Sequence, residues 1–197
     1  MRRGKRQTSV ELPTVEQVQK EQQRLRYQRR YRRTLKSTVS VLIVVAALAI
    51  LVATLWMPVL QIYGTSMTPT LEDGDVIFTV KTHAFDSGDI VAFYYNNKIL
   101  VKRVIAESGD WVNIDADGTV YVNDVAQKET YLDEKALGDT DIQLPYQVPD
   151  GKVFVLGDHR ATSVDSRNTA VGCVGQEQIV GRILFRVWPL ERFGVIK

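Results

Sequence analysis

The sequence contains few cysteines and histidines. It has one cysteine, Cys173, and two histidines, His83 and His159, among 197 residues. A single cysteine excludes a disulfide within the chain. The two histidines are isolated from Cys173 and from each other, so we do not expect a metal site. Cys173 could be a nucleophile, but neither histidine has an evident reason to approach it, and a small core residue is the favoured interpretation.

Charge is absent from residues 39–57, nineteen mainly apolar residues with the sequence VSVLIVVAALAILVATLWM. At 1.5 Å per residue, a helix of this length is roughly 28 Å long, enough to cross the hydrocarbon core of a bilayer. The alternatives are a cleaved secretory signal and a buried core helix. The run is longer than a signal-peptide core, Trp56-Met57-Pro58 is a poor cleavage site, and no polar stripe divides the run. We therefore expect a retained transmembrane helix.

The two flanks of this segment carry opposite charge. Residues 1–38 contain twelve Lys/Arg and three Glu, whereas the remainder contains thirteen basic and twenty acidic residues. Basic residues favour the cytoplasmic side, so we predict a cytoplasmic arm over residues 1–38 and an extracytoplasmic domain over residues 58–197. The basic tract at residues 24–36 could bind nucleic acid. Its position beside the membrane favours contact with lipid instead, and we expect no nucleic-acid partner.

After residue 57, short apolar runs alternate with turn-forming Gly, Asp and Asn. Runs rich in Val, Ile, Phe and Tyr with this spacing are typical of an all-β domain. The sequence YYNNKI at residues 94–99 predicts a hairpin turn. Residues 124–149 are polar and irregular, and we interpret them as an insertion over the β core. The expected strands lie at residues 76–81, 90–95, 99–106, 111–114, 119–122, 153–156 and 179–187.

Lys102 interrupts one of these apolar strands. Successive residues of a strand alternate between its faces, so Lys102 shares a face with Leu100 and Val104. Burial of the strand on both sides would lower the pKa of the Lys102 amine and allow it to act as a base near neutral pH. The alternative is a lysine that reaches solvent from an edge strand.

Ser66 lies in the segment GTSMTPT at residues 64–70. Serine in such a segment is most often only a turn former, but beside a neutral lysine it could be a nucleophile. Nine residues separate it from the end of the apolar run and reach at most ~30 Å, so a membrane-associated polypeptide is a natural substrate. A third segment, GDHRATSVDSR at residues 157–167, could be a solvated loop, an ion-pair network or part of a site.

These three segments together resemble the motifs of the type I signal peptidases, membrane-anchored serine–lysine enzymes that remove signal peptides from exported preproteins. The resemblance covers residues 38–197, and a single N-terminal span is similar to the pattern of Gram-positive members. It rests on three motifs in the expected order: Gly64-x-Ser66-Met67-x-Pro69-Thr70, then Lys102-Arg103-Val104 closed by Gly109-Asp110, then Gly157-Asp158-x-Arg160-x-x-Ser163-x-Asp165-Ser166-Arg167.

The resemblance implies a role for each matching residue. Ser66 attacks the scissile carbonyl, Lys102 takes its proton, and Ser163 hydrogen-bonds the lysine amine and orients it. The backbone N–H of Ser66 donates to the oxyanion. The reaction needs no metal and no cofactor. Structural support is implied for two charged pairs: Arg103 with Asp158, and Asp165 with Arg167.

The resemblance also implies how a substrate binds. Residues 62–64 and 99–101 flank an extended peptide as strands. Small apolar pockets then favour alanine at two positions before the cut, so signal peptides of secreted preproteins are cleaved after Ala-x-Ala. The Sec-type export machinery is an indirect partner. The residues expected to line the substrate site are Ile62, Tyr63, Gly64, Met67, Leu71 and Val101.

A few positions depart from the family pattern. His159 stands where Asn is common, residues 161–162 are less polar than usual, and residues 107–108 replace Leu-Pro. Gly64 replaces a serine whose hydroxyl helps the oxyanion in some members. None of these positions carries a proposed catalytic atom, so we expect them to affect loop geometry and rate rather than the chemistry.

Two other functions are compatible with parts of this pattern. A catalytically silent relative would hold peptides at the membrane as a binding or assembly factor, but it predicts the loss of Ser66 or Lys102, and both are present. A self-cleaving serine–lysine repressor would need a DNA-binding domain. The apolar span and the acidic external domain argue against it.

Overall fold

The computed structural model describes residues 14–56, 58–82 and 84–196. The chain divides into two compact units, residues 1–52 and residues 53–197, and each has its own architecture. Three predicted features lie outside the described residues: residues 1–13 of the arm, Met57 at the end of the membrane segment, and His83.

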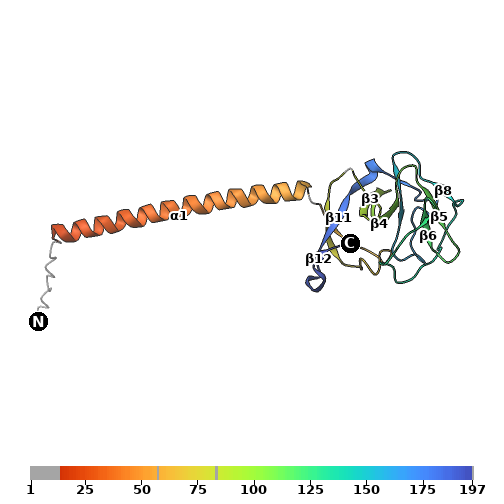
Figure 1. The fold of residues 1–197 in the computed structure, drawn as a ribbon. Coiled ribbons are helices and arrows are strands. Elements are labelled where there is room, and N and C mark those ends of the chain that lie inside the picture. The colour runs from red at the N-terminus through yellow and green to blue at the C-terminus, as the bar shows by residue number, and fades with distance from the viewer. Residues whose placement is uncertain (1–13, 57, 83, 197) are drawn as a thin grey trace, which may run out of the picture. The chain divides into compact units, whose positions relative to one another are not determined.

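The N-terminal helix, α1, spans Val15–Trp56 (Figure 1). It begins with a capping box, in which the Gln17 N–H donates to the Thr14 hydroxyl at 3.4 Å and the Thr14 N–H donates to the Gln17 side chain at 3.0 Å. The helix contains no proline or glycine, and it ends before Pro58. The described part of the arm and the apolar run are therefore one continuous helix of 42 residues. Its apolar part reaches a mean hydropathy of 2.5, and the helix is long enough to cross a membrane.

The C-terminal unit is built of antiparallel strands in two sheets, which confirms the predicted all-β class. The larger sheet has the order β1-β2-β11-β3-β4-β9-β10 with β12 beside β11, and the smaller has the order β7-β6-β5-β8. Figure 1 shows β5, β6 and β8 gathered at one end of this unit, away from β11 and β12. The strands are β1 Val59–Gln61, β2 Val76–Val80, β3 Ile90–Tyr95, β4 Lys98–Ala106, β5 Trp111–Ile114, β6 Val120–Val122, β7 Val125–Ala126, β8 Tyr146–Gln147, β9 Lys152–Leu156, β10 Val174–Gly175, β11 Ile179–Trp188 and β12 Gly194–Val195, with 3₁₀ helices η1 Gln176–Gln178 and η2 Leu190–Arg192.

All seven predicted strands are present, and their bounds differ from the prediction by no more than one residue. Among the described residues the structure adds β1, β7, β8, β10 and β12, which are two or three residues long. A strand this short has no room for a repeating alternation of apolar and polar residues, so its sequence does not distinguish it from a loop.

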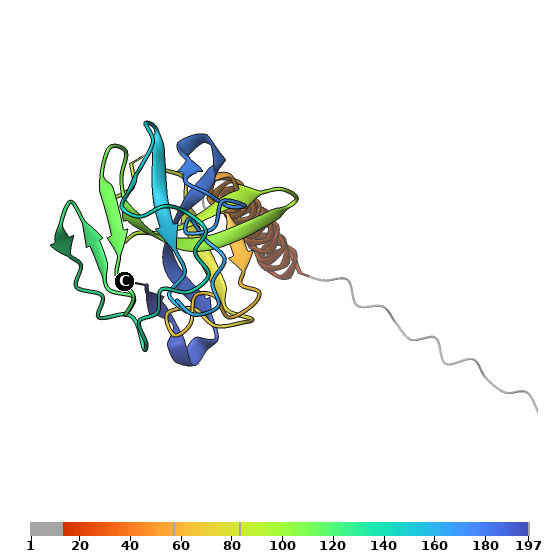
Figure 2. The same cartoon turned by 90° about the vertical axis from the view of Figure 1, so that its right-hand side faces the viewer.

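Strands β3 and β4 form the predicted hairpin, which Figure 2 shows in yellow-green, reaching beyond the neighbouring strands. Tyr95 pairs with Lys98, and Asn96 in the turn has a φ of 51°, a conformation that asparagine tolerates. Strand β4 pairs with β9 only from Arg103 onward. Within the described part of the chain, residues 98–102 therefore have no strand partner along their second edge.

The prediction that residues 62–64 form a strand is wrong. Strand β1 ends at Gln61, and the chain turns at Gly64, where φ is 88°. The Ile62 N–H still donates to the Asp75 carbonyl at 2.8 Å. The ladder thus ends just before the turn because the backbone must reverse there, and a left-handed φ at Gly64 permits the reversal at little steric cost.

Three buried clusters form the core of this unit. The first joins the two sheets and includes Val112, Phe154 and Cys173, so Cys173 is a buried core residue. The second lies around β3, β4 and β9 and includes Val91 and Val104. The third packs under residues 64–70 and contains Ile62, Met67, Leu71, Ile77, Ile90 and Ile183. Burial of these apolar side chains fixes the segments that carry the polar site residues.

Residues 124–149 are mostly irregular in structure, in agreement with their sequence, but they are well packed. They contribute β7 and β8 to the smaller sheet. Leu137, Ile142 and Leu144 pack against the first core cluster. The segment is therefore part of the β unit, not a detached loop.

Candidate active site

Ser66 lies in a turn, residues 64–70, that is anchored on both sides of the serine. The Gly64 N–H donates to the Asp73 carboxylate at 2.7 Å. Met67, directly after the serine, is 2% exposed and packs in the third core cluster. Ser66 itself stays half-buried. A neighbour fixed in the core leaves the serine hydroxyl little freedom to move away from its partners.

Lys102 lies in β4 and is 3% exposed. Its Nζ and the Ser66 Oγ are hydrogen-bonded at 2.6 Å, although the two residues are 36 positions apart in sequence. Val104, on the same face of the strand, is fully buried, and Leu100 is partly buried. The alternative of a lysine that reaches solvent from an edge strand is therefore wrong.

Burial lowers the pKa of Lys102 from 10.5 to about 8. The Asp165 and Asp158 carboxylates act in the opposite direction, because a negative charge favours the ammonium form. The Arg167 guanidinium lowers the pKa further. The amine is thus neutral in a useful fraction of molecules near pH 7, and a neutral amine can accept the serine proton.

The backbone of Ser66 is held by the segment after β9. The Ser66 carbonyl accepts a hydrogen bond from the His159 N–H at 3.1 Å. Gly157 packs so closely that a Cβ there would lie 2.5 Å from the Ser66 carbonyl oxygen. Among the described residues, the Ser66 N–H has no hydrogen-bond acceptor. This donor is therefore available to a ligand.

The two implied charged pairs are both formed and both buried. Arg103 Nε and Nη2 donate to the two carboxylate oxygens of Asp158 at 2.9 and 2.7 Å. Arg167 Nε and Nη2 donate to Asp165 at 2.8 Å each. The Asp165 carboxylate also accepts from the Gly157 N–H at 3.0 Å. Two-point pairing of this kind fixes orientation as well as distance.

Ser163 does not make the hydrogen bond that the resemblance implies. Its side-chain oxygen is buried and has no hydrogen-bond partner in the structure, and Lys102 Nζ donates to Ser66 instead. The Ser163 side chain packs against Gly157, where even an added Cβ would overlap it. The predicted hydrogen bond between Lys102 and Ser163 is therefore not present in the structure.

A groove with a volume of about 570 Å³ opens beside the Ser66–Lys102 pair. Residues 60–64 line it together with Ser66 and Met67, and residues 98–102 of β4 complete the lining. Five of the six residues expected to contact substrate are in this lining. Leu71 is not among them: it is fully buried in the third core cluster, because the Met67–Leu71 turn points it inward.

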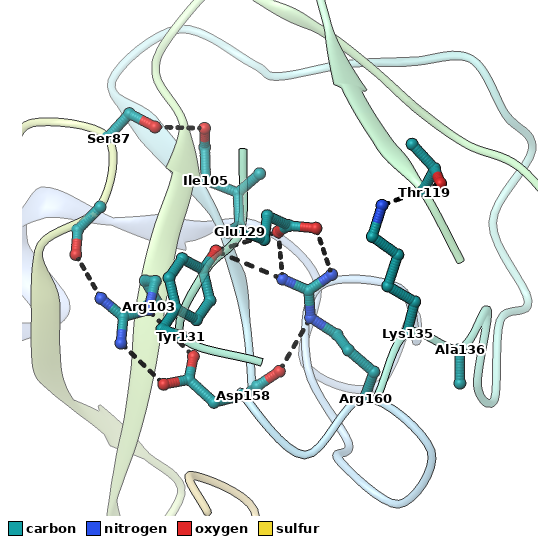
Figure 3. A network of polar contacts seen from close by, with 12 residues as sticks. Ser87, Arg103, Ile105, Thr119, Glu129, Tyr131, Lys135, Ala136, Asp158 and Arg160 are labelled. Carbon is teal, nitrogen blue, oxygen red and sulfur yellow. Dashed lines mark hydrogen bonds and ion pairs between the residues drawn. The ribbon is translucent and has the colours of Figure 1, made fainter. Parts of the chain in front are cut away.

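Two residues near the site, Glu129 and Tyr131, were not identified from the sequence. Glu129 forms an ion pair with Arg160, and the guanidinium carbon of Arg103 lies 3.9 Å from the centre of the Tyr131 ring (Figure 3). Both come from the polar segment 124–149, where no motif or periodicity marks them. Burial, with a smaller contribution from the Glu129 carboxylate, raises the pKa of Tyr131, so its hydroxyl stays a neutral donor.

In the part of the chain that the structure describes, no group of three or more His, Cys, Asp or Glu residues could hold a metal ion. A hydroxyl, an amine of lowered pKa, a free backbone N–H and an adjoining groove together suit nucleophilic attack on a carbonyl carbon.

The chain is similar to several known proteins. Residues 34–188 match the family described as signal peptidase, peptidase S26. The signal peptidase IB of Staphylococcus aureus is 40% identical over 153 residues, which cover 67% of this chain and 78% of that protein. Thylakoidal processing peptidase 1 of Arabidopsis thaliana is 39% identical over 146 residues, which cover 66% of this chain and 41% of that protein. The match thus spans less than half of the plant protein. A signal peptidase I structure from Enterococcus faecalis has 30% identity and a TM-score of 0.41, and covers 50% of this chain and 96% of its own.

Proposed function

The chain belongs to the peptidase S26 family of signal peptidases, whose members are serine endopeptidases, and we propose that Ser66 is its nucleophile and Lys102 its general base. The observation that carries this proposal is the 2.6 Å contact between Lys102 Nζ and Ser66 Oγ at the edge of the groove. A buried amine of lowered pKa is the group that a serine needs for activation in the absence of a histidine partner.

The first chemical step follows from this geometry. Neutral Lys102 accepts the proton of the Ser66 hydroxyl while Oγ bonds to the scissile carbonyl carbon. The carbonyl oxygen then carries negative charge, and the Ser66 N–H, which has no acceptor among the described residues, would donate to it. One preorganised donor of this kind typically contributes about 3 kcal/mol to transition-state stabilisation.

The protonated Lys102 then serves as the acid of the reaction. It gives its proton to the leaving amine as the peptide bond breaks, and an acyl ester on Ser66 remains. Neutral again, Lys102 deprotonates a water molecule that hydrolyses the ester and restores the hydroxyl. A single residue can perform both tasks because its pKa of about 8 lies close to the working pH.

The groove supports binding of the substrate as an extended strand. Strand β1 pairs only with β2, and residues 98–102 pair only with β3, so among the described strands each has one open edge. A peptide between these edges can hydrogen-bond to backbone on both sides. Ile62, Met67 and Val101 give the wall an apolar surface, which suits small residues such as alanine at alternate positions before the cut.

The described residues include one apolar N-terminal helix, and the family is membrane-bound. We propose that residues 1–38 are cytoplasmic and that the β unit lies outside, because the arm is basic and the β unit acidic. Signal peptides of preproteins that leave through the Sec-type machinery would then meet the β unit on the extracytoplasmic side of the membrane. Digestion of spheroplasts with an added protease tests this: loss of the β unit supports the orientation, and its protection contradicts it.

The catalytic proposal is tested with full-length protein in detergent and a preprotein that carries an Ala-x-Ala signal peptide. Wild type should cut after the second alanine, whereas Ser66→Ala and Lys102→Ala should be folded and inert. Binding of the preprotein by wild type without cleavage would favour the alternative, a silent relative that only holds peptides.

A further inference from the structure

A short segment of the 124–149 insertion contacts two buried arginines near the site, Arg103 and Arg160. We call residues 129–131 the clamp. Glu129 pairs with Arg160, with 2% and 1% of the two side chains exposed. The Tyr131 ring covers the Arg103 guanidinium at 3.9 Å, and the Tyr131 hydroxyl donates to Glu129 at 2.9 Å. Figure 3 shows the ring of Tyr131 against Arg103 and the carboxylate of Glu129 facing Arg160.

The two arginines bind adjacent residues of the segment after β9, one through a backbone carbonyl and the other through a carboxylate. Arg160 Nε donates to the Gly157 carbonyl at 3.1 Å. Arg103 holds the Asp158 carboxylate at two points. The next residue, His159, donates its N–H to the Ser66 carbonyl at 3.1 Å. A continuous set of contacts therefore leads from the clamp to the peptide unit of the serine.

This backbone stretch tolerates little displacement. The close approach of Gly157 to the Ser66 carbonyl leaves no room for a Cβ. A shift of residues 157–159 would alter the His159 hydrogen bond and displace the Ser66 carbonyl, and with it the Cα that carries the Ser66 side chain and N–H. Errors of about 1 Å in a catalytic arrangement can lower a rate by roughly a hundredfold.

We propose that the clamp is a positioning element for catalysis: Glu129 and Tyr131, acting through Arg160 and Arg103, fix the backbone that orients the Ser66 peptide unit. This inference rests on the proposed role of Ser66. Buried ion pairs contribute little net stability compared with well-packed apolar side chains, so stability alone gives the pair no advantage here. The Glu129–Arg160 pair and the Tyr131 ring instead fix the positions of the Arg160 and Arg103 side chains. These side chains in turn fix residues 157–158.

The test compares two variants that change the clamp with a control variant outside it. Glu129→Gln keeps the side-chain size and removes the charge, and Tyr131→Leu removes the ring from Arg103. For both we expect the kcat for an Ala-x-Ala peptide to fall roughly tenfold to a hundredfold, and the KM to change little, because other residues line the groove. Tyr131→Phe keeps the ring and loses the hydroxyl, so it should lie between wild type and Tyr131→Leu. Glu177→Gln, at an exposed carboxylate of η1, is the matched control and should retain the wild-type kcat.

A second readout does not depend on activity. Amide hydrogen exchange at His159 should be faster in Glu129→Gln and Tyr131→Leu than in wild type, while exchange at Val112 in β5 should not change. If the wild type cleaves nothing, the proposed function fails, and the His159 exchange still reports on the clamp.

Three outcomes would overturn the inference. The first is a wild-type kcat and wild-type His159 exchange in folded Glu129→Gln and Tyr131→Leu. The second is a raised KM at constant kcat, which would assign the clamp to substrate binding. The third is failure of both variants to fold, which would assign it to stability alone.

Discussion

Replacement of Leu100 by asparagine should move the acid limb of the pH–rate profile to higher pH. Leu100 lies two residues before Lys102 in β4, on the same face of the strand, and it is partly buried in the second core cluster. A polar side chain there would bring hydration closer to the amine. Since burial is the main cause of the lowered Lys102 pKa, part of that effect should be lost.

The magnitude follows from the value for the wild type. Lowering the pKa of Lys102 from 10.5 to about 8 corresponds to roughly 3 kcal/mol in favour of the neutral amine. At pH 7 about a tenth of the molecules then have a neutral Lys102, against roughly three in ten thousand for an ordinary lysine. If Leu100→Asn raises the pKa of Lys102 by about one unit, the rate at pH 7, expressed as a fraction of the high-pH plateau, falls about tenfold from its wild-type value.

The assay is kcat/KM for an Ala-x-Ala peptide between pH 5 and 10, because this parameter reports the ionisation of the free enzyme. Leu100 lines the groove, so the plateau can change, but the midpoint of the limb is independent of its height. Ile99→Asn is the control: Ile99 also lines the groove but lies on the opposite face of the strand from Lys102. A midpoint that stays near pH 8 in Leu100→Asn, or moves equally in Ile99→Asn, would refute the assignment to burial.

Three further predictions concern the same region. Lys102→Met should be more stable than wild type to urea at pH 7. The folded-state pKa of Lys102 lies below the unfolded value, so the wild type gains stability, up to roughly 3 kcal/mol, only as the pH rises from about 8 to 10.5. A stability difference between the two proteins that does not vary with pH would contradict this. Gly157→Ala should lower kcat by a hundredfold or more in a peptide assay, because the new Cβ would meet the Ser66 carbonyl oxygen; near-normal turnover would show that this backbone can move. Asp158→Asn should cost about 3–5 kcal/mol in urea unfolding, because it leaves a buried Arg103 without its counter-charge, and adding Arg103→Met should recover most of that loss; an equal loss in the double variant would argue against pairing.

The anchor and the strand pattern could be predicted because both are written in local sequence. A run of nineteen uncharged residues indicates a membrane helix wherever it occurs, and an alternation or run of β-branched residues between turn formers indicates a strand. The prediction for residues 62–64 was wrong, since the reversal at Gly64 overrides the apolar and aromatic character of Ile62 and Tyr63. Strands β1, β7, β8, β10 and β12 were not predicted, because each is defined by its pairing rather than by a pattern in its own sequence.

For the site, the sequence predicted the identities of several residues but not all of their contacts. The motifs identified Ser66, Lys102 and the charged pairs, but not the contacts of Ser163, whose oxygen is buried without a partner. They also gave no sign of Glu129 and Tyr131. A motif indicates which side chains are present in a segment, whereas a hydrogen bond depends on how two segments pack.

By itself, the sequence determined that one apolar helix precedes an all-β unit, and it determined which serine and which lysine to test. The tertiary structure alone decided that Lys102 is buried, that its amine meets Ser66 across 36 positions, and that Arg160 meets Glu129 across 31. The physical reason is that patterning and turn preference act between near neighbours in the chain. Desolvation of an amine and alignment of a donor depend on every segment that the core brings around them.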